Sequence, residues 1–210
     1  MLTYINSPLK RYGRRIIVCA VLLILISTVT AFTFFWPKYE QSFFELGLLG
    51  ENRKAEQYYK DNDPNINISS RINWYIYVHN YMHTPQFVNI KVKLLNSTML
   101  PPNDRLHLPS PFPPLVEYSV SLNTNGAVVL PFSWSILNAS RSGDSIVIDR
   151  LTVDNSTVSS EVYSSSSNMF RLVFELWVYN QTSQKYDFGW RSGSDYGSAS
   201  VFMWFNLILD

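Results

Sequence analysis

Apolar and polar residues alternate with a period of two in much of the chain beyond residue 70. Residues 72–79 read Ile-Asn-Trp-Tyr-Ile-Tyr-Val-His, and residues 88–94 repeat the alternation with Val, Ile, Val and Leu on one side. This period is typical of a β-strand that buries one face. Only the short loop 80–85 separates the two runs, so we expect them to form a β-hairpin. On the first strand, Tyr75 and Tyr77 should point away from the core.

Further strands with turn signals between them are predicted along the rest of the chain, at 116–122, 128–134, 146–153, 170–178, 187–190 and 201–209. About eight such strands predict an all-β fold, an antiparallel Ig-like β-sandwich. The segment 101–114 holds six prolines, and we expect a long connection that crosses between the sheets. Residues 51–60 are the best candidate for a short turn of helix, and the serine-rich segment 159–167 is expected to be a loop.

One segment breaks the strand pattern, because residues 16–35 form an uncharged apolar run. As a helix its 20 residues would span about 30 Å, the thickness of a membrane hydrocarbon core. The cations before it are Lys10, Arg11, Arg14 and Arg15, and a Lys/Arg excess marks the cytoplasmic side. We therefore expect a cytoplasmic basic tail (1–15), a transmembrane helix (16–36) and an extracytoplasmic β-sandwich domain (37–210). The alternative is a cleaved signal peptide, whose apolar region is usually shorter.

Composition fits an exported globular domain. Charged residues make up 16% of the chain, and 46% of residues are hydrophobic, which excludes a charge-rich disordered protein. The four cations before the apolar run leave residues 37–210 mildly acidic, so no basic face for nucleic acid is expected. Cys19, the one cysteine, lies inside the apolar run. Five Asn-x-Ser/Thr sequons follow the run and are glycosylation candidates, namely Asn67, Asn96, Asn138, Asn155 and Asn180.

Candidate chemistry is sparse. His79, Met82 and His83 lie close together in one loop, and imidazole with thioether is a ligand set for copper. There is no Gly-rich phosphate loop and no Gly-x-Ser-x-Gly elbow, and the exported part has no cysteine nucleophile. We therefore expect no catalytic residue and no cofactor, with copper at the histidine loop as the alternative.

Two short motifs carry a family resemblance. Residues 43–50 read Phe-Phe-Glu-Leu-Gly-Leu-Leu-Gly, and a later strand ends in Val78-His79-Asn80. Together with the anchor and the sandwich pattern, they make residues 40–210 resemble an archaeal membrane-anchored family, domain of unknown function sixteen-sixteen. The proline-rich insert and the single anchor helix depart from that family. The resemblance implies an archaeal surface protein with a sandwich ectodomain, and it implies no activity.

These patterns favour a non-enzymatic, single-pass membrane protein. Its outer domain would bind other membrane or cell-envelope proteins as an accessory or assembly subunit, with outward aromatic side chains as contacts. Ser27 and Ala31 have the small-xxx-small spacing that permits helix packing in the lipid bilayer. One alternative is a metal-binding subunit of an archaeal copper membrane monooxygenase-type complex. Another is the subunit of a surface fibre built by strand exchange.

Overall fold

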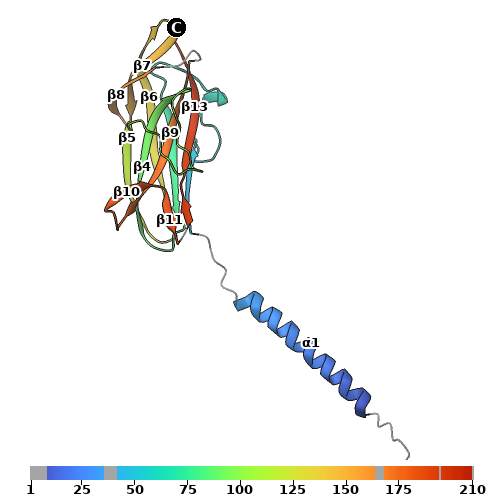
Figure 1. Ribbon diagram of the computed structural model, residues 1–210. Helices are drawn as coiled ribbons and strands as arrows, with labels where there is room; N and C mark the ends of the chain where they lie inside the picture. Colours follow the sequence, from blue (N-terminus) through green and yellow to red (C-terminus); the bar gives the residue numbers. More distant parts are fainter. Residues whose placement is uncertain (1–8, 36–41, 164–167, 194, 210) are drawn as a thin grey trace, which may run out of the picture. The chain divides into compact units, whose positions relative to one another are not determined.

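The protein divides into two compact units, Met1–Gln41 and Ser42–Asp210. The structure, a computed structural model, describes residues 9–35, 42–163, 168–193 and 195–209 (Figure 1). The first unit contains α1 (Leu9–Phe35). The second unit contains one 3-10 turn, η1 (Lys60–Asn62), and the β-strands. The strands are β1 (Phe44–Leu49), β2 (Asn65–Asn67), β3 (Ile72–Asn80), β4 (Gln86–Asn96), β5 (Val116–Leu122), β6 (Ala127–Ser142), β7 (Ser145–Val153), β8 (Ser156–Tyr163), β9 (Met169–Asn180), β10 (Lys185–Phe188), β11 (Trp190–Ser192), β12 (Asp195–Gly197) and β13 (Ser200–Ile208).

Two sheets pack face to face in the second unit. The first sheet has the strand order β1-β3-β6-β7-β8, and the second has the order β2-β13-β9-β4-β5, with β10 added beside β9. A small separate ladder joins β11 to β12. The pairs between named strands are antiparallel except β2 with β13, which is parallel. The predicted Ig-like β-sandwich is therefore the fold of this unit.

The predicted hairpin of β3 and β4 is wrong. β3 pairs with β1 and β6 in the first sheet, whereas β4 pairs with β5 and β9 in the second. The loop between them therefore carries the chain from one sheet to the other. Both strands bury one alternating face, so the period of two identified their inward residues without identifying their neighbours.

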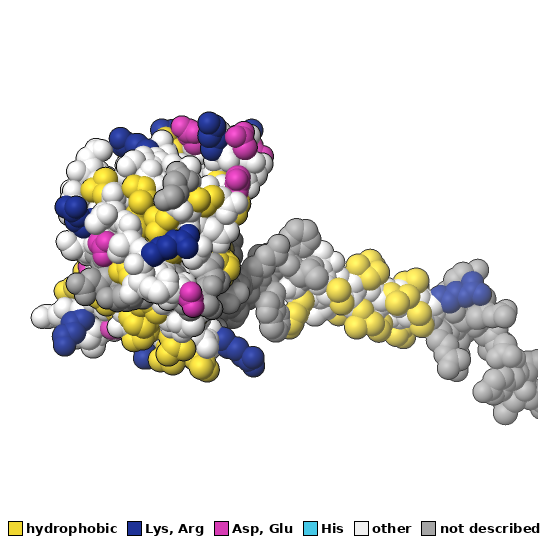
Figure 2. Space-filling model, turned by 90° about the horizontal axis from the view of Figure 1, so that it is seen from above, with side chains coloured by type: hydrophobic (Ala, Val, Ile, Leu, Met, Phe, Trp, Pro, Cys, Tyr) yellow, Lys and Arg dark blue, Asp and Glu magenta, His cyan; other side chains and the backbone are white. Residues whose placement is uncertain are grey.

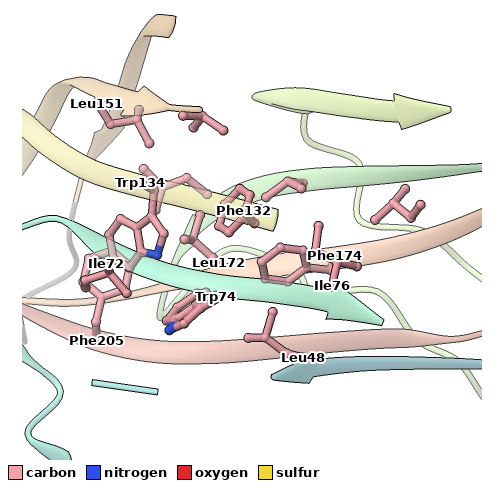
Figure 3. Packing of buried hydrophobic residues seen from close by; sticks show 14 of the residues in the cluster. Leu48, Ile72, Trp74, Ile76, Phe132, Trp134, Leu151, Leu172, Phe174 and Phe205 are labelled. Carbon is pink, nitrogen blue, oxygen red and sulfur yellow. The ribbon is translucent and has the colours of Figure 1, made fainter. Parts of the chain in front are cut away.

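Aromatic side chains fill the space between the sheets (Figure 3). The Trp74 and Trp134 rings lie 5.3 Å apart, and the Phe205 ring lies 4.9 Å from that of Trp134. Phe132 meets Phe174 edge to face at 5.1 Å, which joins the first sheet to the second. Edge-to-face pairs of this kind add to the hydrophobic gain of burial. The inward side chains of β3, β6, β9 and β13 thus build one core.

β13 shows how the alternation assigns side chains to faces. Phe205 and Leu207 are buried in the core, as the sequence predicts. Trp204 points to the outer face of the second sheet, where its ring meets the Arg171 guanidinium.

Three loop predictions differ from the structure. The proline-rich segment joins β4 to β5, which are neighbours in the same sheet, so it does not cross between sheets. It lies over the outer face of that sheet, and we call residues 97–115 the strap. Residues 51–57 form turns and bends, and the helical turn comes later, at η1. Part of the serine-rich segment belongs to β8, and residues 164–167 lie outside the described residues.

The helix of the first unit is apolar on all sides. Between Arg15 and Phe32 it is long and apolar enough to cross a membrane, and none of this stretch is buried. Figure 2 shows hydrophobic side chains along its described length and the Lys/Arg colour towards one end. A surface this apolar is unsuited to water, so the helix fits a membrane anchor or a signal sequence.

Candidate functional site

The outer face of the first sheet carries a row of aromatic side chains. Along β3, Trp74, Ile76 and Val78 are at most 1% exposed, whereas Tyr75 and Tyr77 between them are half-buried and face outward. This confirms their predicted orientation. The guanidinium of Arg53 lies 4.9 Å from the centre of the Tyr75 ring. At the start of β1, Phe43 stacks on Tyr81 with ring centres 4.5 Å apart.

The histidine loop does not assemble a free ligand set. The Nε2 of His79 lies 3.1 Å from the carbonyl oxygen of Asn125, which only accepts, so Nε2 carries the proton. Nδ1 then accepts from the Tyr77 hydroxyl at 3.1 Å, and the His79 ring packs on Tyr81 at 3.9 Å. Met82 packs against the hydrophobic core, while His83 is exposed with φ of 59°. Within the described residues no three His, Cys, Asp or Glu side chains form a group that could hold a metal ion. A copper ion bound at Nδ1 of His79 would have to displace the Tyr77 hydroxyl.

The strap is fixed to the second sheet by a buried ion pair. The Lys93 ammonium lies 2.8 Å from the Glu175 carboxylate, and the two side chains are 3% and 0% exposed. The strap residue Ser110 joins both charges, because its carbonyl accepts from Lys93 at 2.6 Å and its amide donates to Glu175 at 2.7 Å. Trp177 donates to the same carboxylate at 3.1 Å. Each charge therefore has several partners, which buried charges require.

Two more contacts hold the ends of the strap. Arg171 donates to the carbonyl of Met99 at 2.6 Å, and its guanidinium lies 4.6 Å from the centre of the Trp204 ring. Further along the strap, the Asp104 carboxylate accepts from the Ser200 amide at 3.1 Å and from the Ser200 hydroxyl at 3.0 Å. The strap is thus attached to β4, β9 and β13 rather than hanging free.

A serine–histidine contact also belongs to the strap. His107 Nδ1 lies 3.1 Å from the Ser198 hydroxyl oxygen, and that hydroxyl donates to the carbonyl of Asp104 at 2.9 Å. Its single proton therefore points at a carbonyl rather than at the imidazole. In a catalytic serine the hydroxyl proton is directed at a histidine. The contact fastens the strap to the segment before β13, and sequence reasoning had no signal for it.

Three leucines project from the strap into solvent. Leu100, Leu106 and Leu108 are 68%, 62% and 56% exposed. Leu100 and Ser110 are joined by a hydrogen bond of 3.0 Å from the Ser110 hydroxyl, and Leu108 forms a two-way backbone bridge with Asn103. Because the strap backbone is held in this way, the leucines are presented in a fixed arrangement. Exposed apolar side chains that are grouped on one element often mark an interaction surface.

A groove opens at the margin of the sandwich, where β3, β6 and the turn after β7 in the first sheet meet β5 of the second sheet. The groove has a volume of about 600 Å³ and is lined by β3, β5, β6, the turn after β7, and Glu51. Tyr118 of β5 reaches its wall and donates a hydrogen bond to Asp154 in the turn. Asp154 also accepts from the Ser133 amide at 2.9 Å, which ties the turn to β6. Burial and the Asp154 contact raise the pKa of Tyr118 well above its ordinary value, so this hydroxyl stays protonated.

Several polar groups of the groove have no hydrogen-bond partner among the described residues. The side-chain amides of Asn73 and Asn155 and the hydroxyl of Tyr75 make no hydrogen bond to any described residue. Arg71 uses one nitrogen, which donates to the Ser133 hydroxyl at 3.2 Å. A few convergent polar groups beside aromatic rings are typical of ligand sites, and the volume lies within the usual range. From the sequence we had named Tyr75 alone of the groove residues as an outward residue. The other residues come together only where β3, β5, β6 and the turn after β7 meet in the folded domain.

The five sequons differ in the accessibility of their side chains. Asn67, Asn138 and Asn155 are exposed. Asn96 is 8% exposed, and its carbonyl oxygen accepts from the amides of Thr98 and Met99 at 2.8 Å. Asn180 donates to Asp187 at 2.7 Å. In the folded domain the first three are therefore open to a modifying enzyme.

The anchor residues named from the sequence lie on α1. Lys10, Arg11 and Arg14 fall in its first turns, and the Arg15 side chain is exposed. The Ser27 hydroxyl donates to the carbonyl of Ile24 at 2.9 Å, so its hydrogen bond is made within the helix. Ser27 and Ala31 are both small side chains of α1, one helical turn apart. Trp36, the expected end of the transmembrane segment, lies outside the described residues.

Comparisons with known proteins find no family, and the solved structures that resemble this chain do so distantly. No family model and no curated protein matches the chain. The CARDB domain of a Pyrococcus furiosus protein, solved with di-metal ions, is 9% identical with a TM-score of 0.39, and the match covers 82% of this chain and 99% of that domain. The C-terminal domain of wzt is 8% identical with a TM-score of 0.36, covering 83% and 80%. A Listeria innocua β-glucosidase solved with gluconolactone is 10% identical with a TM-score of 0.37, covering 79% and 16%. Likeness at this level carries no information about ligand or activity.

Proposed function

We propose that the chain is a membrane-anchored, non-enzymatic binding module. Its β-sandwich would lie outside the cytoplasm and dock onto another membrane or cell-envelope protein as an accessory or assembly subunit. The apolar helix and the cations Lys10, Arg11, Arg14 and Arg15 before it support this placement. The motifs around residues 43–50 and 78–80, which carry the family resemblance, support an archaeal surface as the setting.

The observation that carries the proposal is the strap with its exposed leucines. A buried ion pair, Lys93–Glu175, and the Asp104 and Arg171 contacts hold a proline-rich segment in place. A surface segment fixed so firmly binds a partner with little loss of conformational entropy, which raises affinity. Leu100, Leu106 and Leu108 would then supply the apolar contact area.

The absence of catalysis is part of the proposal and rests on the placement of reactive groups. The single cysteine lies in α1. His79 is bonded through both ring nitrogens, and the Ser198 hydroxyl next to His107 donates to a carbonyl. None of these side chains is arranged to activate a nucleophile.

The test uses the full chain extracted from its native membranes in a mild detergent. We expect native gels and mass spectrometry to find it in an assembly larger than the chain alone. Replacing Leu100, Leu106 and Leu108 together by Ser should release the free chain. The matched control replaces three exposed apolar residues outside the strap, Ile68, Leu137 and Ile208, by Ser and should keep the assembly.

Two results would contradict the proposal. One is recovery of the unaltered chain alone, and the other is an assembly that survives the strap substitutions as well as the control does. Metal analysis of the same preparation tests the copper alternative. Stoichiometric copper that disappears in the His79→Ala, His83→Ala variant would favour a metal-handling subunit instead.

A further inference from the structure

We propose that the groove beside β6 binds an uncharged saccharide. The groove lies where β3, β6 and the turn after β7 of the first sheet meet Tyr118 of β5 in the second sheet. No residue of the strap lines it, so the inference does not depend on the protein partner proposed above. Its walls come from β3, β5, β6 and the turn after β7. The Tyr118–Asp154 and Asp154–Ser133 hydrogen bonds fix the corner where β5, β6 and the turn meet. A site with fixed walls loses little entropy on binding.

The polar groups of the groove match hydroxyl groups. Asn73 and Asn155 each offer an amide that both donates and accepts, and a sugar hydroxyl also does both. The Tyr75 hydroxyl adds another such group, and Arg71 adds donors beyond the one used on Ser133. The side chains of Asn73 and Tyr75 are half-buried without a partner among the described residues. Water reaches these polar atoms in the groove, so a ligand hydroxyl that enters would take the place of a water partner of each.

The aromatic and charged residues narrow the class of ligand. Tyr75 and Tyr118 provide flat apolar surface of the kind that packs against the C–H face of a sugar ring. The positive charge of Arg71 is opposed by Glu51 and Asp154, so the lining does not select a phosphate or another anion. A purely apolar ligand would leave the amides without partners. An uncharged polyhydroxylated molecule can pack on the aromatic rings, carries no charge and offers hydroxyl groups to the amides.

The saccharide has two possible sources, because Asn155 is itself a glycosylation candidate. Asn155 lies in the turn after β7 with φ of 67°, is exposed, and lines the groove. A glycan attached there would begin at the rim, so the chain's own glycan would compete with a glycan of the surrounding envelope. Both sources present the same chemistry to Asn73 and Tyr75.

The experiment uses the full chain in detergent, produced once in a host without N-glycosylation and once in a glycosylating host. The probes are neutral oligomers of glucose, mannose, galactose and N-acetylglucosamine. Sialylated oligomers and an unrelated peptide library serve as comparison, and binding is measured by calorimetry.

We expect the unglycosylated chain to bind at least one neutral oligomer. Asn73→Ala and Tyr75→Ala should each weaken binding at least tenfold. Tyr77→Ala is the matched control, because this neighbouring tyrosine faces the same side of β3 and does not line the groove.

The arms then separate the sources. If the occupant is the chain's own glycan, the glycosylated chain does not bind the oligomers, and Thr157→Ala, which removes the sequon and leaves Asn155 in place, restores binding. If the occupant comes from outside, both preparations bind. The inference is overturned if no neutral oligomer binds the unglycosylated chain, if only sialylated probes or peptides bind, or if Tyr77→Ala weakens binding as much as Tyr75→Ala does.

Discussion

A single side-chain amide, that of Asn80, joins three segments at one end of the sandwich. Its nitrogen donates to the carbonyls of Thr84 at 2.8 Å and Asn123 at 3.0 Å, and its oxygen accepts from the Met82 amide at 2.9 Å. The residue is fully buried. It therefore fixes the two loops through which the chain passes from β3 to β4 and from β5 to β6. The Val-His-Asn motif that carried the family resemblance has this structural role at its last position.

Replacing Asn80 tests this role. In Asn80→Ala the two carbonyls lose their donor inside the protein, and we expect a loss of about 2–3 kcal/mol in the free energy of unfolding. Asn80→Asp should lose more, because a carboxylate would face the same carbonyls. Urea unfolding of the full chain in non-ionic detergent, followed by tryptophan fluorescence, measures the change. Asn73→Ala on the same strand is the control and should stay within about 0.5 kcal/mol. Equal effects at the two positions would show that Asn80 is not such a junction.

The strap is the element that sequence reasoning could interpret least. Its six prolines excluded a regular strand correctly, but proline content does not reveal where a connection runs. The outward residues Lys93 and Glu175 are polar because they anchor the strap, and in the sequence they look like solvated positions on alternating strands. By contrast, the inward faces of β3 and β9 were predicted correctly, since burial on one face leaves a local period of two. Pairing partners, buried charges and the groove arise from contacts between segments distant in sequence.

The ion pair under the strap gives a prediction for this element. Glu175→Gln leaves the Lys93 ammonium without a countercharge in a site where it is 3% exposed. We expect a loss of about 3–5 kcal/mol in the free energy of unfolding, or a strap that detaches and becomes accessible to trypsin at the exposed Arg105. Denaturant unfolding and limited proteolysis measure the two effects.

The control for that prediction is Glu117→Gln. Glu117 also contacts a lysine of β4, Lys91, at 3.8 Å, but its side chain is 41% exposed. A pair in contact with solvent contributes at most about 1 kcal/mol. If the two glutamine variants are equally stable and equally resistant to trypsin, the Lys93–Glu175 pair does not hold the strap.

At the scale of the whole molecule, both binding proposals require that the β-sandwich faces the outside of the cell and stays attached to α1. The sequence indicates this arrangement more directly than the fold does. A long apolar run favours insertion into a membrane, and cations on one side of the run favour the cytoplasm for that side. The single cysteine makes the arrangement measurable. Cys19 lies in the apolar stretch of α1, and a thiol that lies in lipid is out of reach of a membrane-impermeant maleimide.

We expect a membrane-impermeant maleimide to leave the unaltered chain unlabelled on intact cells. In a Cys19→Ala background, Ser140→Cys on β6 should be labelled from outside, whereas Ser7→Cys should react only after permeabilisation.

Counting reactive thiols in the denatured, purified chain distinguishes a retained anchor from a cleaved signal peptide. One reactive thiol per unaltered chain shows that α1 is retained, whereas none shows that it was removed with Cys19. Ser140→Cys that reacts only in permeabilised cells would mean the opposite orientation, and the strap and the groove would then face the cytoplasm, where neither an envelope partner nor a surface glycan could reach them.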